Sequence, residues 1–100
     1  MTNRMVLSGI VVKTPIREVS PSGITHWQFY LEHRSEQNEV GLKRQVQCYL
    51  PVVMSGHNES NNRIKKGNKV RITGFIATHQ RQNKIAQLIL HADHIEFLGE

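Results

Sequence analysis

The chain has 100 residues, of which 38% are hydrophobic and 21% are charged. A chain of this length folds around one core, which excludes an enzyme whose site lies in a cleft between two domains. Thirteen Lys and Arg against eight Asp and Glu leave a formal charge of +5, which favours a polyanionic partner. The single cysteine, Cys48, excludes an intramolecular disulfide and is typical of a reducing compartment.

Alternation of apolar and polar residues predicts β-structure along most of the chain. A first strand is expected from Met5 to Val12, with a bulge at Gly9, bending to continue from Ile16 to Val19. The Ser-Pro-Ser-Gly sequence at 20–23 predicts a reversing turn, because proline presets one backbone dihedral and glycine accepts a positive one. A second strand is therefore expected over residues 24–32.

The middle of the chain is expected to contain a loop and a third strand. Residues 33–43 are polar and are predicted to form the loop. Arg44 to Leu50 alternate as the strand, and Pro51 is expected to end its hydrogen-bond ladder. Cys48 has the same parity as the apolar residues on either side, which predicts a buried small side chain rather than a nucleophile.

Two further strands are expected in the last third of the chain. Residues 52–66 show no amphipathic stripe and are predicted to hold at most one short turn of helix. A fourth strand is expected to begin after residues 66–68, a polar turn is expected at 79–84, and a fifth strand is expected over 85–97. We predict one all-β domain covering the whole chain, a small closed five-stranded barrel with little or no helix.

The cations are unevenly distributed. Residues 60–92 contain no acid, yet they hold seven of the thirteen cations. One interpretation is a solvated surface whose charges pair with distant carboxylates, and the other is a track that neutralises the phosphates of a polyanion. The seven cations are Arg63, Lys65, Lys66, Lys69, Arg71, Arg81 and Lys84.

Two tyrosines are candidates for base stacking. Alternation places Tyr30 and Tyr49 on the polar faces of the second and third predicted strands, where an exposed ring could stack on a nucleic-acid base. Each ring could equally be half-buried filler with its hydroxyl in water. Trp27 shares its parity with apolar neighbours and is predicted to belong to the core.

Catalysis, metal binding and membrane insertion are disfavoured. His91 and His94 are three apart, which on a strand points them to opposite faces, and no thiol or acidic cluster completes a metal site. No nucleophile elbow, phosphate-binding loop or pair of carboxylates is evident. No apolar run approaches the ~20 residues of a membrane-spanning helix. The sequence therefore predicts a binding protein and not an enzyme, with no cofactor.

Several stretches resemble primosomal replication protein N, the PriB family of bacterial replication-restart proteins related to single-stranded DNA-binding protein. The similar stretches are Met1 to Gly9, Val19 to Ile24, Phe29 to Ser35, Pro51 to His57 and Leu90 to Ala92, whereas 58–67 matches poorly. The resemblance covers essentially the whole chain. It implies an oligonucleotide/oligosaccharide-binding (OB) barrel, a homodimer that binds single-stranded DNA, and contacts with the helicase PriA and with DnaT. It also implies a cytoplasmic protein, nucleoid-associated at replication forks.

The resemblance also implies where DNA would bind and where this chain departs from its relatives. Gln47 stands where better-known members carry an exposed tryptophan, Leu42 where they carry a phenylalanine, and Glu18 where they carry a lysine. The candidate DNA-binding residues, combining charge placement, exposed rings and the resemblance, are Lys13, Arg17, Tyr30, Arg34, Lys43, Arg44, Gln47, Tyr49, Arg81 and Lys84.

These departures leave two hypotheses open. Tyr49 lies two residues from Gln47 and hence on the same face, so it could replace the lost stacking ring. Alternatively, the chain binds DNA weakly and acts mainly as a protein adaptor, and an RNA-binding barrel is also compatible with the charge. Met5, Val6 and Leu7 are consecutive apolar residues, so the outward side chains of the first strand are expected near a two-fold axis.

Overall fold

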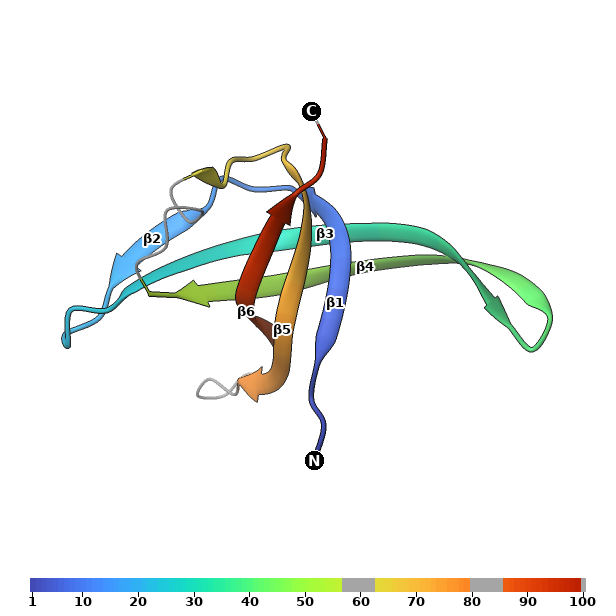
Figure 1. Cartoon of the computed structure of the whole chain (residues 1–100), viewed down its shortest axis with the longest axis horizontal. Coiled ribbons are helices and arrows are strands. Elements are labelled where there is room, and N and C mark those ends of the chain that lie inside the picture. The colour runs from blue at the N-terminus through green and yellow to red at the C-terminus, as the bar shows by residue number, and fades with distance from the viewer. Residues whose placement is uncertain (57–62, 80–85, 100) are drawn as a thin grey trace.

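A computed structural model describes residues 1–56, 63–79 and 86–99. Within these ranges the chain forms strands joined by turns and short connections, and it contains no α-helix (Figure 1). None of the described residues forms a helix that is long and apolar enough to cross a membrane. The strands are β1 (Met5–Val11), β2 (Ile16–Val19), β3 (Thr25–Glu39), β4 (Leu42–Ser55), β5 (Lys69–His79) and β6 (Gln87–Phe97).

The strands form one sheet that closes into a barrel. Their order is β1-β5-β6-β4-β3-β2, and an additional pairing of β1 with β3 closes the ring of five strands. The end of β1 makes this closure, with Ile10 opposite Glu32 and Val11 opposite Leu31. The β4–β6 pairing is parallel over Val52–Met54, and the other strand pairs are antiparallel. The predicted all-β class and five-stranded barrel are confirmed.

The core lies inside this barrel and follows the alternation in the sequence. Each strand that closes the ring contributes one or two apolar side chains with at most 6% of their surface exposed. Ile64, from the segment that precedes β5, joins them. Trp27, predicted to belong to the core, is only partly buried and packs against it. The core side chains are Val11, Phe29, Leu31, Val52, Met54, Ile64, Val70, Ile72, Leu90 and Ile95.

The first predicted strand is two strands, and its expected bulge is absent. β1 ends at Val11 and β2 begins at Ile16, and both pair with β3. At Gly9 the register between β1 and β5 is continuous, so the bulge prediction was wrong. A Cβ there would collide with the carbonyl oxygen of Glu32, because β1 crosses onto β3 at this point. Glycine is needed for close approach and not for an extra residue.

The predicted loop at 33–43 is instead a hairpin, and this prediction was wrong. β3 and β4 remain paired from His26 and Ser55 out to Glu39 and Leu42. Val40 and Gly41 close the hairpin with positive φ angles of 50° and 76°, the backbone of a two-residue hairpin turn. Polar residues can form this hairpin because the hydrogen bonds between β3 and β4 satisfy their backbone N–H and C=O groups, and no side chain has to be buried. We call residues 33–48 the arm; Figure 1 shows it projecting far beyond the barrel.

Two other predictions for the third strand were wrong. Pro51 does not end the strand, since it lies within β4 opposite Tyr30 and pairing continues on both sides of it. One missing N–H removes a single donor from a ladder that is otherwise intact. Cys48 is an exposed free thiol and not a core residue, because it is paired with His33 on the arm, where no opposing sheet covers it.

The turn predicted at 20–23 is present. The Gly23 N–H donates to the Ser20 carbonyl oxygen at 2.8 Å, and Gly23 has a φ of 87°. The Ser20 hydroxyl accepts a hydrogen bond from the Ile24 N–H at 3.1 Å. This turn reverses the chain from β2 into β3, which carries one side of the surface described next.

Candidate nucleic-acid interface

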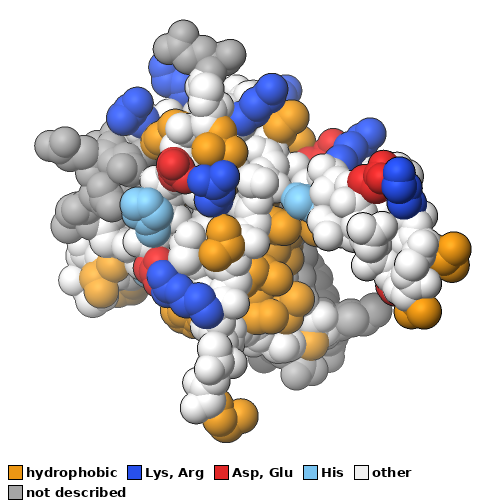
Figure 2. All heavy atoms as spheres, turned by 45° about the vertical axis from the view of Figure 1, so that its right-hand side comes forward, with side chains coloured by type: hydrophobic (Ala, Val, Ile, Leu, Met, Phe, Trp, Pro, Cys, Tyr) orange, Lys and Arg blue, Asp and Glu red, His pale blue; other side chains and the backbone are white. Residues whose placement is uncertain are grey.

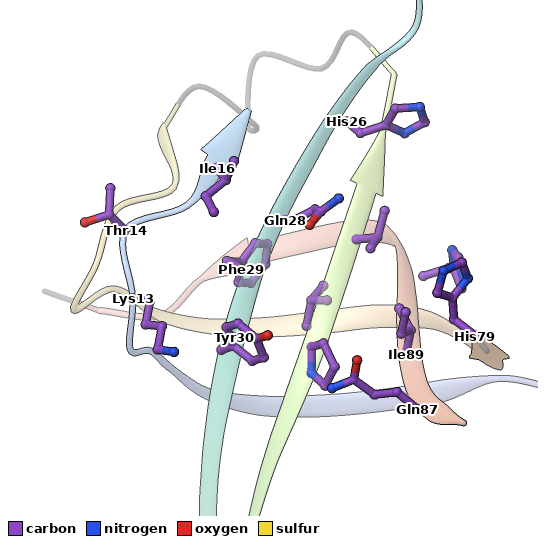
Figure 3. Close-up of a pocket in the computed structure, with 14 residues that line it drawn as sticks. Lys13, Thr14, Ile16, His26, Gln28, Phe29, Tyr30, His79, Gln87 and Ile89 are labelled. Carbon is purple, nitrogen blue, oxygen red and sulfur yellow. The ribbon is translucent and has the colours of Figure 1, made fainter. Parts of the chain in front are cut away.

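A groove of about 520 Å³ crosses the outer face of β3 and β4. The 13–16 segment forms one wall, and the end of β5 with the start of β6 forms the other (Figure 3). Lys13, Tyr30, His79 and Gln87 point into it from these elements. Among the described residues that line it, none is Asp or Glu, and Lys13 carries a positive charge. The groove therefore combines a largely apolar surface with a positive charge and is open to an extended polyanion.

A pair of stacked tyrosines lies at this groove. The Tyr30 and Tyr49 rings have centroids 5.0 Å apart and an interplanar angle of 14°. Tyr30 lines the groove, and Tyr49 is 47% exposed beside it. The Lys13 ammonium lies 4.9 Å from the Tyr30 ring centroid, within cation–π distance. The site thus presents a planar apolar surface with a positive charge at its edge.

A second stacked pair lies on the opposite side of the groove. His91 of β6 lines the groove, and its ring is stacked on Phe75 of β5 with centroids 4.9 Å apart and planes 9° apart. Phe75 is 45% exposed, because alternation along β5 points it away from the core that Val70 and Ile72 enter. Two aromatic pairs therefore flank the same groove, one on β3 and β4 and one on β5 and β6.

The predicted cations of the arm lie outside the groove, and each contacts a carboxylate. Figure 2 shows acidic and basic side chains next to one another on the arm. The three cations are exposed to solvent, and of their partners only Glu32 is partly buried. The pairs are Arg34 Nε to Glu32 Oε1 at 3.0 Å, Lys43 Nζ to Glu36 Oε1 at 3.7 Å, and Arg44 Nη1 to Glu39 Oε1 at 3.1 Å.

The remaining predicted residues have varied positions. Gln47 lies on β4 opposite Arg34, on the face that carries Tyr49. Arg17 is opposite Trp27 in β3, so its side chain leaves β2 on the face away from the groove. Arg81 and Lys84 lie outside the described residues.

Several groove residues were not singled out from the sequence. His26 and Gln28 lie on the same face of β3 as Tyr30, and alternation alone places them there. His91 was considered only as a metal ligand. His79 and Gln87 pair with each other across β5 and β6, a contact between segments whose register the sequence does not reveal.

Comparison with known proteins identifies the family. Residues 3–94 match the model of a family described as another single-strand binding protein family. Replication restart protein PriB of Escherichia coli O1:K1 / APEC is 49% identical over 100 residues, covering 98% of this chain and 96% of that protein. The chain belongs to the PriB family.

Solved structures confirm the fold. PriB from Ralstonia solanacearum superposes with a TM-score of 0.79 at 23% identity, covering 98% of this chain and all of that chain. A Plasmodium falciparum SSB, solved in complex with ssDNA, gives a TM-score of 0.80 at 16% identity, covering 99% and 96%. Both likenesses concern the fold, which is the OB barrel that the PriB resemblance implied.

Membership in the PriB family confirms two predictions made from sequence. The resemblance to primosomal replication protein N is correct. The matched family is one of binding proteins, which agrees with the prediction of a binding protein and not an enzyme.

Proposed function

We propose that the groove binds single-stranded DNA, and that the chain serves replication restart through this binding. One observation carries the proposal: stacked rings and Lys13 face a groove on the β3–β4 face whose described lining contains no carboxylate. That face and its flanking loops are where OB folds bind oligonucleotides. Membership in the PriB family supports the same conclusion.

The geometry assigns different tasks to rings and cations. A base stacks on the exposed ring of Tyr49, which Tyr30 holds in place from the other side of the stack. Such stacking is worth ~1–3 kcal/mol per base and needs no particular sequence. The Lys13 ammonium, beside the Tyr30 ring, neutralises a phosphate next to that base. His91 on Phe75 offers a second platform across the groove.

The arm and the remaining predicted residues have secondary tasks in this proposal. Gln47 shares the face of Tyr49 and can hydrogen-bond to a base or sugar. Arg34, Lys43 and Arg44 contact DNA only after exchanging a carboxylate for a phosphate. Arg81 and Lys84, which lie outside the described residues, complete the proposed set.

A fluorescence-anisotropy titration tests the proposal. Single-stranded DNA, duplex DNA and RNA oligonucleotides are titrated at two salt concentrations. We expect tighter binding of single strands than of duplex, with a log-log salt slope of about 2 or more, as three neutralised phosphates at ~0.7 each require. A flat salt dependence, or equal affinity for duplex and single strand, contradicts groove binding. Tighter binding of poly-U than of dT oligonucleotides would instead indicate an RNA-binding module.

A second candidate function is that of a protein adaptor with weak DNA binding. The specific observation in its favour is that the three cations of the arm already contact carboxylates. An arm whose cations are already paired with carboxylates suits contact with a folded protein better than with a polyanion. In this role we propose that the chain bridges PriA and DnaT. Retention of either protein by an immobilised chain, with DNA removed by nuclease, tests the bridge.

We propose a homodimer built on β1. Val6 is 58% exposed and Ile10 is 41% exposed on the outside of this strand, and a second copy would cover both. Sedimentation at micromolar concentration is expected to give twice the 11.5 kDa mass of one chain. A monomer that persists to high concentration contradicts the dimer. We further propose that the protein acts at replication forks in the bacterial cytoplasm, in association with the nucleoid.

A further inference from the structure

A cluster of four cations lies on the segment that leads into β5. Arg63, Lys65, Lys66 and Lys69 are all exposed, and we call them the basic corner. The Arg63 guanidinium lies over the Phe97 ring, 4.8 Å from its centroid. Within the described ranges, no carboxylate forms an ion pair with any of the four. This differs from the arm, where each cation has a carboxylate partner.

The backbone of the basic corner is held in a fixed turn. Ile64, only 5% exposed, anchors it in the core. The Lys65 N–H donates to the Asn68 side-chain oxygen at 2.7 Å, and the Asn68 N–H donates back to the Lys65 carbonyl oxygen at 3.1 Å. Gly67 accepts the positive φ of 93° that this turn requires. The two neighbouring lysines therefore project from a preorganised frame.

The same turn is joined to the wall of the groove. The Gly67 N–H donates to the Val11 carbonyl oxygen at 2.7 Å, and the Val11 N–H donates to the Asn68 carbonyl oxygen at 3.0 Å. Lys13, which lines the groove, is two residues beyond Val11. Its Cα therefore lies at most ~7 Å from the Cα of Val11, the residue that is hydrogen-bonded to the turn. Figures 1 and 3 both show this segment beside the β1–β2 connection.

We propose that the basic corner binds the phosphates of single-stranded DNA where the strand leaves the groove past Lys13. This inference rests on the proposed function and adds an exit path to it. The ligand is the sugar-phosphate backbone of the DNA, because the corner offers ammonium groups and a guanidinium, which bind phosphates. Among the described residues, no carboxylate is paired with these charges. Lys13 and the basic corner then form one continuous positive track.

The test uses oligonucleotide length to separate the groove from the basic corner. The full chain is titrated with oligo-dT of about 5 and about 20 nucleotides, near the lower and beyond the upper end of the ~4–16 nucleotides that one OB fold covers. The variant is Lys65→Gln/Lys66→Gln. Its matched control is Arg4→Gln/Arg71→Gln, which removes the same charge from cations that contact Asp93 and Glu96.

We expect the lysine variant to bind the long oligonucleotide about 5- to 25-fold more weakly near 0.1 M salt, with the salt slope lowered by about 1.4, as two lost phosphate contacts predict. Binding of the short oligonucleotide is expected to change by less than about twofold, as is binding of either oligonucleotide by the control. An unchanged long-oligonucleotide affinity overturns the proposal, and so does an equal loss in the control.

The outcome also distinguishes the two proposals from each other. If wild type binds the short oligonucleotide and the lysine variant binds both lengths like wild type, the basic corner is excluded while the groove remains. If wild type binds neither length, both proposals fail. If wild type binds an acidic peptide at the basic corner and DNA of either length does not displace that peptide, the corner binds protein and the exit path is wrong.

Discussion

The groove and the arm lie on the same two strands, yet they differ in charge. Along the groove, Lys13 and the aromatic rings face a surface whose described lining residues include no carboxylate. On the arm, each of three cations contacts a carboxylate, two of which lie on the arm itself and the third of which is Glu32 at its base. A cation attracts a polyanion only to the extent that no neighbouring anion cancels its field. Counting residue types alone therefore overestimates the attraction of the arm for a polyanion and underestimates that of the groove.

The largest expected difference between barrel and arm is in stability. Leu31→Ala removes a fully buried side chain and is expected to lower the free energy of unfolding by about 2–5 kcal/mol. Cys48→Ala, on the exposed arm, is expected to change it by less than about 0.5 kcal/mol. Urea denaturation of both variants measures the two values. Similar values would show that the arm shares the packing of the barrel.

The next effect is loss of stacking at the groove. Tyr49→Ala is expected to weaken oligo-dT binding by about 5- to 150-fold, since base stacking is worth ~1–3 kcal/mol. Tyr49→Phe keeps the ring and serves as the control, with affinity near that of wild type. Anisotropy titrations give both affinities. A loss below about twofold for the alanine variant would mean that Tyr49 does not replace the missing tryptophan at Gln47.

A single cation should matter more in the groove than on the arm. Lys13→Gln is expected to weaken binding about fivefold near 0.1 M salt, as one phosphate contact at ~0.7 of log-log slope requires. Arg44→Gln removes a cation already paired with Glu39 and is expected to cost less than about twofold. The salt slopes of both variants provide the measurement. The reverse order would refute the electrostatic contrast between the two regions.

The smallest effect should be a gain. Glu32 accepts from Arg34 and lies opposite Tyr49, next to the proposed stacking surface. Glu32→Gln removes one repulsive charge and releases Arg34, so affinity is expected to rise by about two- to threefold, in keeping with the ~0–1 kcal/mol of an exposed ion pair. Competition between wild type and variant for one labelled oligonucleotide resolves such a difference. A weaker variant would mean that the ion pair positions Arg34 for DNA.

Much of the barrel could be predicted from the sequence, because burial on one face of a strand enforces alternation. Phe29 and Leu31 on β3, and Val70 and Ile72 on β5, show that pattern directly. The arm could not be predicted in the same way. Its ladder depends on backbone pairing and on the Val40–Gly41 turn, neither of which requires apolar residues.

The candidate site was only partly accessible to sequence reasoning. Tyr30 and Tyr49 were predicted to be exposed because alternation assigns a residue to a face, but their stacking follows from the β3–β4 register. The ion pairs of the arm arise within and across its strands, so counting cations along the sequence could not find them. The same limit applies to Phe75, whose contact with His91 joins β5 to β6.

Besides the β1–β3 closure, the parallel pairing of β4 with β6 is a short seam of the barrel. It spans only Val52 to Met54 among the described residues, whereas β3 and β4 are paired over most of their length. Val52 and Val53 line the groove from one side of the seam, and His91 lines it from the other. Amide protons at the seam should therefore exchange with solvent earlier than those of β3. A DNA strand bound in the proposed groove would contact both sides of the seam. Binding would therefore slow this exchange and stabilise the closed barrel.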